Sequence, residues 1–320
     1  YGLGSATGAI YQDTVRIGGI SSPGQVFIAA SSMNNVQPAN VDGLLGLGFS
    51  ALSWANSKVS GSLKGKSSFI ENVNSNPSVR PANFQPAFGL FLEHTKSSDP
   101  NLVTSNGGEL AIGSNVGNPA RYAGQLNWAS VPNTNAWWII SLNGVSWSPR
   151  SGQGASTLVS GSGYTAIVDS GGLGGGGIFG RVGGVFGYGG RNTDFGSAAG
   201  TSLITVDLKT AQTLNNALGA YGTGIPGLWG VNCQQIAQSS VVIHFNINGV
   251  DYPLTGADLV VPTYATQPSV CYAPFQVLNG ADTTKSFILG EVFLRKYYSV
   301  YDYNYQNGKA NPRVGFALAV

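Results

Sequence analysis

The sequence is poor in charge, because Lys, Arg, Asp and Glu together make up only 9% of its 320 residues. The 16 basic and 14 acidic residues leave a formal net charge of +2 at pH 7, and the basic residues form no runs. A nucleic-acid-binding surface needs clustered Lys and Arg side chains. We therefore expect no nucleic acid partner.

Long apolar runs are also missing, and no stretch approaches the ~20 apolar residues of a membrane-spanning helix. The chain is nevertheless 42% hydrophobic, which is far too apolar for a disordered protein. We expect a soluble globular chain without a membrane partner. Its length is more than one ordinary core organises, so two lobes or one large domain is the starting expectation.

Histidine and cysteine are scarce. His94 sits in a polar stretch and His244 inside a strand pattern, and neither has a Ser or Cys nearby in a nucleophile motif. This argues against a Ser-His-Asp hydrolase and against a zinc site. Cys233 and Cys271 lie 38 positions apart without a CxxC pattern, which suits one disulfide better than a metal site, two buried thiols being the alternative. We expect no metal, no cofactor and an oxidising, secreted context.

What the chain has in abundance is glycine and aromatic residues: 47 Gly, 14 Tyr, 14 Phe and 6 Trp. Together with many Ser, Thr, Val and Ile, they favour short strands joined by tight turns. Helical patterns are sparse, the better ones being Ser68–Val73 and Leu208–Leu218, the second with Asp207 as an N-cap and Gly219 as a stop. We expect a fold dominated by β structure, with strands over the following segments: Gly8–Gly19, Val26–Ala30, Gly108–Gly113, Trp137–Leu142, Thr165–Asp169, Val241–Ile247 and Tyr297–Tyr301.

One segment differs from the rest in composition. Residues 172–200 contain 13 glycines in 29 residues, with apolar side chains in no strand or helix period. A flexible loop is one interpretation. A phosphate-binding loop is the other, but no GxxxxGK[ST] motif follows and no GxGxxG turn opens a helix. We therefore expect no nucleotide site here.

The best candidate for chemistry is Asp169. It follows the apolar run Ala166–Val168 and precedes Ser170 and Gly171, so the carboxylate lies where a buried strand ends in a sharp turn. Burying a carboxylate is costly unless it is hydrogen-bonded. From these residues alone, Asp169 is either a structural turn residue or a catalytic acid.

Several motifs, read together and in order, resemble the pepsin-like aspartic endopeptidases, and the resemblance runs from Tyr1 to Val320 apart from residues 172–200. Tyr1–Gly8 and Asp13–Gly19 are similar to the active-site flap hairpin and the strand that leaves it. Ala166–Gly171 is similar to the second catalytic Asp-Thr/Ser-Gly. The other matching segments include the apolar-apolar-Gly motifs of both lobes: Val41–Gly48, Trp138–Leu142, Asn248–Leu254, Phe287–Asp302 and Val314–Ala317.

The resemblance implies a bilobal, pepsin-like acid protease fold. Residues 1–126 would be a remnant of the N-terminal lobe that begins at the flap, and residues 127–320 would be the C-terminal lobe with an insertion at 172–200. In this family two carboxyl groups share a proton across a bound water molecule and hydrolyse a peptide bond. Asp169 would be one of the two.

The resemblance also assigns supporting roles. Ser170 would orient the catalytic turn, and Gly171 and Thr201 would border the substrate backbone. Tyr1 and Gly2 would close over an extended peptide through β-type hydrogen bonds. The apolar-apolar-Gly motifs would support the two catalytic turns through the following four residues: Leu45, Gly46, Leu289 and Gly290.

The sequence departs from the family pattern in two places. The family has another Asp-Thr-Gly upstream of the flap, whereas this sequence starts at the flap, so we expect an N-terminally truncated first lobe that is inactive as given. The family also continues its second motif as Asp-Ser-Gly-Thr-Ser-Leu, and here residues 172–200 separate Gly171 from Thr201. One hypothesis is that this segment is a translated, unspliced intron, and the other is that it is a genuine surface loop.

The predicted function is therefore that of an aspartic endopeptidase acting on extended peptides. The alternative is a non-catalytic peptide-binding or protein-binding module of the same fold, a pseudo-protease. We expect a peptide or protein substrate as partner, a monomer when complete, and a secreted or vacuolar/lysosomal location.

Overall fold

A computed structural model describes most of the chain, namely residues 5–34, 43–61, 64, 67–93, 108–132, 137–149, 154–170, 177–179, 203–262, 269–277 and 285–320. Strands dominate these residues and helices are few and short, which confirms the expected β-dominated fold class. The two predicted strands near the N-terminus form one long antiparallel hairpin, β1 (Ser5–Ile17) and β2 (Ile20–Asn34). Its turn is Gly18-Gly19, and both glycines have positive φ, which favours residues without a Cβ.

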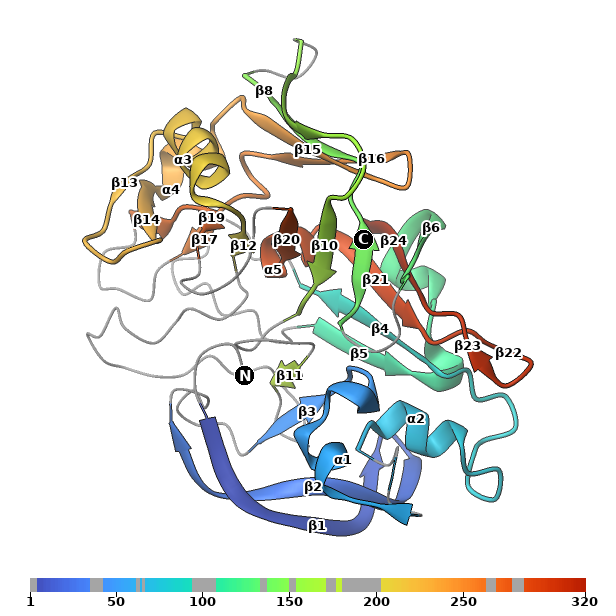
Figure 1. Cartoon of the computed structure of the whole chain (residues 1–320). Helices are drawn as coiled ribbons and strands as arrows, with labels where there is room; N and C mark the ends of the chain where they lie inside the picture. The colour runs from blue at the N-terminus through green and yellow to red at the C-terminus, as the bar shows by residue number, and fades with distance from the viewer. Residues whose placement is uncertain are drawn as a thin grey trace.

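Next to this hairpin lie two short helices, α1 (Trp54–Lys58) and α2 (Phe69–Asn74) (Figure 1). The second one confirms the helix expected at 68–73, with Ser68 as its N-cap residue. Strand β3 (Leu44–Gly46) lies in the same region and pairs with β11 (Gly177–Phe179), the part of the 172–200 segment that the structure describes.

The central feature is a five-stranded sheet in the order β5-β4-β21-β24-β6. It is antiparallel throughout and joins strands from the middle of the chain to strands from its C-terminal end (Figure 1). The expected lobe boundary at 126/127 falls inside β6, so this strand continues across it, and the division into lobes stays a prediction. The bounds are β4 (Ala87–Leu92), β5 (Gly108–Ile112), β6 (Tyr122–Ser130), β21 (Tyr297–Asp302) and β24 (Arg313–Ala319).

A second five-stranded sheet has the order β19-β12-β20-β10-β7. It contains β10, the strand that ends directly before Asp169. In it β10 runs parallel to β20 and antiparallel to β7. The bounds are β7 (Ile139–Ser141), β10 (Thr165–Val168), β12 (Ile204–Thr205), β19 (Phe275–Gln276) and β20 (Ser286–Leu289).

Two four-stranded sheets and one small hairpin complete the strands. The sheet β16-β15-β8-β9 consists of β8 (Gly144–Ser148), β9 (Ser156–Ser160), β15 (Val242–Ile247) and β16 (Val250–Thr255). The sheet β13-β14-β18-β17 consists of β13 (Tyr221–Gly222), β14 (Trp229–Asn232), β17 (Val261–Pro262) and β18 (Val270–Tyr272). The hairpin is β22 (Tyr305–Gln306) with β23 (Lys309–Ala310).

The longest helix, α3 (Leu208–Ala217), forms where the sequence predicts it. The carboxylate of Asp207 accepts a hydrogen bond from the backbone N–H of Thr210 at 3.0 Å, and Gly219 just after the helix has a φ of 73°. Two further helices, α4 (Cys233–Ala237) and α5 (Glu291–Leu294), were not expected, because four or five residues are too few to show a helical period. Single turns of 3-10 helix occur at Ser50–Leu52, Gly113–Asn115 and Pro119–Arg121.

The disulfide expected from the sequence is present. Cys233, the first residue of α4, is bonded to Cys271 in β18, with a Cα–Cα distance of 5.1 Å. The alternative of two buried free thiols is therefore excluded. The bond fixes α4 to β18, an inner strand of the β13-β14-β18-β17 sheet.

Candidate active site

Asp169 is the first residue after β10, and its side chain is buried, with 1% of the residue exposed. Its backbone N–H donates to the carbonyl of Leu289 at 3.1 Å, while the N–H of Val168 donates to the carbonyl of Trp138 at 3.0 Å. The chain is thus held on both sides up to Asp169. The sequence-based expectation of a carboxylate at the end of a buried strand is what the structure shows.

The neighbouring strand β20 contains the apolar-apolar-Gly motif of the second lobe. Val168 stands opposite Leu289 in the parallel register, and Leu289 is fully buried. Gly290 follows directly and is the N-cap residue of α5. Leu289 and Gly290 therefore lie beside the end of β10, and their support of a catalytic turn stays a prediction.

The corresponding motif of the first lobe lies in β3. Its residues Leu45 and Gly46 pair in an antiparallel register with Ile178 and Gly177 of β11. The two similar motifs thus have different neighbours in this chain. One stands next to the strand that carries Asp169, and the other next to a strand from the glycine-rich segment.

A cluster of aromatic side chains packs around the Asp169 strand. The ring of Trp138 contacts the ring of Tyr301 edge to face, with a centroid distance of 5.4 Å, and Tyr301 stacks on Phe88 at 4.5 Å. The indole N–H of Trp138 donates to the carbonyl of Leu47 at 3.1 Å, and the hydroxyl of Tyr303 donates to the same carbonyl at 3.3 Å. This cluster connects the segment after β3 to the strand that precedes Asp169.

The electrostatic surroundings of Asp169 include the phenol of Tyr301. Burial raises the pKa of the Tyr301 hydroxyl well above its usual value, and the nearby charge of Asp169 raises it further. The hydroxyl of Ser299 lies close enough to offset a small part of this rise in pKa. Ser299 and Tyr301 were not singled out from the sequence, because their proximity to Asp169 depends on the packing of two different sheets.

Other predicted site residues fall partly outside the described part of the chain. Ser170 is described and is half-buried. Tyr1, Gly2, Gly171 and Thr201 lie outside the described residues, so their proposed contacts with substrate stay predictions. His244 contacts Asp251 at 2.8 Å on the β15–β16 pair, whereas His94 is outside the described residues.

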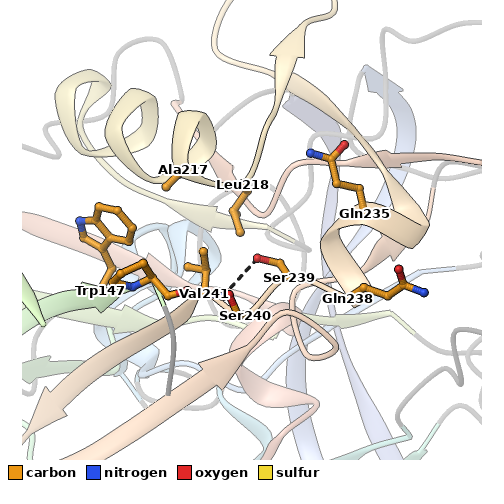
Figure 2. A pocket seen from close by; sticks show the side chains of 9 residues that line it. Trp147, Ala217, Leu218, Gln235, Gln238, Ser239, Ser240 and Val241 are labelled. Carbon is orange, nitrogen blue, oxygen red and sulfur yellow. Dashed lines mark hydrogen bonds between the residues drawn. The ribbon is translucent and has the colours of Figure 1, made fainter. Parts of the chain in front are cut away.

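One hollow among the described residues lies away from Asp169. It has a volume of about 500 Å³ and lies between the end of α3, helix α4 and strands β8 and β15 (Figure 2). Trp147 and Leu218 form part of its wall, and the backbone N–H of Val241 donates to the Ser239 hydroxyl at 3.2 Å on its floor. Nothing in its lining is acidic or basic. We assign no chemistry to it.

The described residues offer neither a metal-binding cluster nor a membrane-spanning helix. They contain no group of three His, Cys, Asp or Glu side chains close enough to hold a metal ion. None of the helices in the part of the chain that the structure covers is long and apolar enough to cross a membrane.

A buried aspartate in an Asp-Ser-Gly motif, beside an apolar-apolar-Gly strand, is a feature of aspartic proteases, and the comparison with protein families agrees with it. The model of the eukaryotic aspartyl protease family matches residues 1–173 and 197–319, so the chain belongs to this family. The part left unmatched, 174–196, lies inside the segment 172–200 that departs from the family pattern in the sequence.

Individual relatives are cathepsins and pepsins. The chain is 30% identical to cathepsin E of Rattus norvegicus over 324 residues, which covers all of this chain and 65% of the relative. It is 29% identical to cathepsin D of Chionodraco hamatus, over all of this chain and 65% of that relative. It is 27% identical to pepsin A of Sus scrofa, over 99% of this chain and 65% of that relative. The chain thus spans about 65% of the length of these curated relatives.

Proposed function

We propose that the complete protein is an aspartic endopeptidase and that Asp169 is one of its two catalytic carboxyl groups. The observation that carries this proposal is the position of Asp169. It is buried at the end of β10, held between β7 and β20 by backbone hydrogen bonds, in the one Asp-Ser/Thr-Gly motif of this sequence.

The proposed reaction needs two carboxyl groups and one water molecule. Two carboxyl groups a few ångströms apart cannot both ionise easily, so one stays protonated while the other is a carboxylate. The carboxylate takes a proton from the water, whose oxygen attacks the peptide carbonyl carbon, while the protonated carboxyl donates to the carbonyl oxygen. The amide nitrogen then receives a proton, the C–N bond breaks, and an acid and an amine are released.

The second carboxyl must come from another stretch of chain, because this sequence holds a single Asp-Ser/Thr-Gly. We propose that the strand carrying this second carboxyl lies beside β3, as the Asp169 strand lies beside β20. The support is the similarity between Leu44-Leu45-Gly46 in β3 and Ile288-Leu289-Gly290 at β20, where β20 lies beside the Asp169 strand. The 320 residues alone would then bind a proton at Asp169 but would not hydrolyse peptides.

The proposed substrate is an extended polypeptide. Tyr1 and Gly2 would cover it from the flap side, and Gly171 and Thr201 would border its backbone, through the β-type hydrogen bonds that extended peptides form with strand edges. The proposed setting is a secreted or vacuolar/lysosomal compartment, and the Cys233–Cys271 disulfide supports an oxidising one. We propose that the complete protein is a monomer.

The decisive experiment compares the complete protein with its Asp169→Asn variant on an unfolded protein substrate over a range of pH. We expect hydrolysis at acid pH, where one carboxyl of the pair is protonated, and a loss of at least about 10³-fold in kcat for Asp169→Asn, since neither half of the pair works alone. The control variant is Ser160→Ala, at the end of β9, which should keep full activity. Activity that survives Asp169→Asn would refute the proposal, and tight peptide binding without cleavage by the complete protein would identify a pseudo-protease instead.

A further inference from the structure

Two buried hydroxyl groups on β21 have no hydrogen-bonded partner among the described residues. They belong to Ser299 and Tyr301, which are two positions apart on β21 and therefore point to the same face of the central sheet. Ser299 is 0% exposed and Tyr301 is 2% exposed. Their oxygens lie near each other but do not meet the geometry of a hydrogen bond.

A buried hydroxyl without a hydrogen-bonded partner needs a physical explanation. Leaving a buried hydroxyl without a partner costs roughly 1–3 kcal/mol, so unpaired polar groups of this kind are few in proteins. The rest of the neighbourhood on this face is aromatic, since Tyr301 packs against Phe88 and Trp138. An apolar side chain at either position would avoid the cost.

The acidic group in the electrostatic surroundings of the Tyr301 hydroxyl is Asp169. The two residues come from different sheets, and Trp138 contacts both neighbourhoods: its carbonyl accepts from the N–H of Val168, next to Asp169, and its ring contacts the ring of Tyr301. On α5, which follows β20 directly, Glu291 and Arg295 pair with each other at 3.0 Å, so their charges balance. Tyr303, further along the chain, is instead influenced by Glu71.

We propose that Tyr301 is a positioning residue for Asp169. With Ser299 it binds one buried water molecule, and through this water it donates a hydrogen bond to the rear of the Asp169 carboxyl. Three polar partners, namely two hydroxyls and one carboxyl, are what a buried water molecule typically has. The arrangement satisfies both hydroxyls and limits the rotation of the carboxyl.

The chemical consequence concerns the proton on Asp169. A hydrogen bond donated to a carboxylate stabilises its charged form and lowers its pKa. Removing the donor therefore raises the pKa of Asp169. In the complete protein the same change moves the acid limb of the pH–rate profile to higher pH, a step of the inference that rests on the proposed function.

The main test needs no activity and uses the 320-residue chain. The Asp residues are labelled with ¹³C at the carboxyl carbon, the Asp169 signal is assigned with Asp169→Asn, and its titration is followed by NMR. We expect Tyr301→Phe, which keeps the ring and its packing, to raise the pKa of Asp169 by roughly half a unit to one unit. Ser299→Ala should shift it in the same direction by less.

The matched control is Tyr298→Phe. It removes a hydroxyl from an equally buried tyrosine on the same strand, but Tyr298 points to the opposite face, where its hydroxyl accepts from the N–H of Gly117 at 3.3 Å. We expect no change in the Asp169 titration. An unchanged titration in Tyr301→Phe, or an equal shift in Tyr298→Phe, would overturn the proposal. If Tyr301→Phe does not fold, Ser299→Ala decides the question alone.

Failure of this inference and failure of the proposed function can be told apart. The first is read from the titration of Asp169 in the present chain, and the second from activity of the complete protein after Asp169→Asn. In an active complete protein, Tyr301→Phe should shift the acid limb of kcat with little change in KM. A variant that lost only thermal stability, with an unshifted profile, would show a purely structural tyrosine.

Discussion

The indole N–H of Trp138 donates a hydrogen bond to the carbonyl oxygen of Leu47, 91 positions earlier in the chain. Trp138 also accepts, through its own carbonyl, the N–H of Val168 next to Asp169. One residue thus links the segment that follows the first-lobe motif to the strand that leads into the candidate catalytic turn. The aromatic cluster around it is a structural connection between these parts of the molecule.

Replacing Trp138 with Phe should therefore destabilise the protein. The variant loses the hydrogen bond to Leu47 and part of a ring that is only 2% exposed, and we expect a loss of about 2 kcal/mol in the free energy of unfolding. Urea denaturation followed by far-UV circular dichroism measures it. Trp54→Phe is the matched control, because Trp54 is 60% exposed and should change stability by no more than about 0.5 kcal/mol. Equal effects of the two substitutions would contradict the assigned role.

The disulfide should contribute substantially to stability. It closes a loop of 39 residues counted inclusively (271 − 233 + 1), and on the loop-entropy model its loss costs about 3–4 kcal/mol. We expect the double variant Cys233→Ser/Cys271→Ser to unfold at a clearly lower urea concentration. Thiol titration of the unmodified protein under denaturing conditions should find no reactive thiol, and two reactive thiols would contradict the bond.

Alkaline pH should destabilise the fold through its buried tyrosines. Burial raises the pKa of Tyr252 to about 12, from an ordinary value of 10.0. Above pH 10 the unfolded chain loses this proton and the folded one keeps it, so the contribution to stability is fully present below pH 10 and is lost between pH 10 and 12.

The measurement is the free energy of unfolding as a function of pH, with phenolate absorbance recorded in parallel. Each such phenol should add a fall of about 1.4 kcal/mol per pH unit in this window. The matched variant is Tyr252→Phe, in which the fall should be shallower by about that amount. An identical slope in the two proteins would show that Tyr252 ionises alike in the folded and unfolded states.

Deleting residues 172–200 should raise the stability of the protein and the activity of its complete form. The 13 glycines of this segment carry a large ordering cost, and the deletion joins Gly171 to Thr201 so that the family motif becomes continuous. We expect a higher midpoint of urea unfolding and a steeper unfolding transition. In the complete protein we expect the deletion to raise activity. The fit of the family model without residues 174–196 points in the same direction.

The control for this deletion replaces residues 172–200 with a Gly-Ser segment of equal length. It should behave like the unmodified chain if the length of the insertion is what disturbs the turn. A deletion variant that is less stable than the unmodified chain would show that the pairing of β11 with β3 belongs to the native fold. The segment would then be a genuine loop, and the intron hypothesis would be wrong.

Much of the fold could be read from local patterns. The cap at Asp207 and the stop at Gly219 depend on neighbouring backbone geometry, and the structure confirms both. The position of Asp169 at a strand end was accessible for the same reason. Helix α5 was missed because four residues give no period, and β11 was missed because three residues among glycines carry no alternating pattern.

The sequence by itself determined the family and the candidate catalytic carboxyl, and it limited any disulfide to a single pairing. Its motifs occur in the family order, Asp169 stands in its own short motif, and two cysteines have one possible pairing within the chain. Only the tertiary structure decided which side chains surround that carboxyl. Ser299 and Tyr301 belong to a different sheet from the Asp169 strand, and Trp138 contacts both sheets through its carbonyl and its ring. Such contacts depend on the packing of distant strands, which no local period encodes.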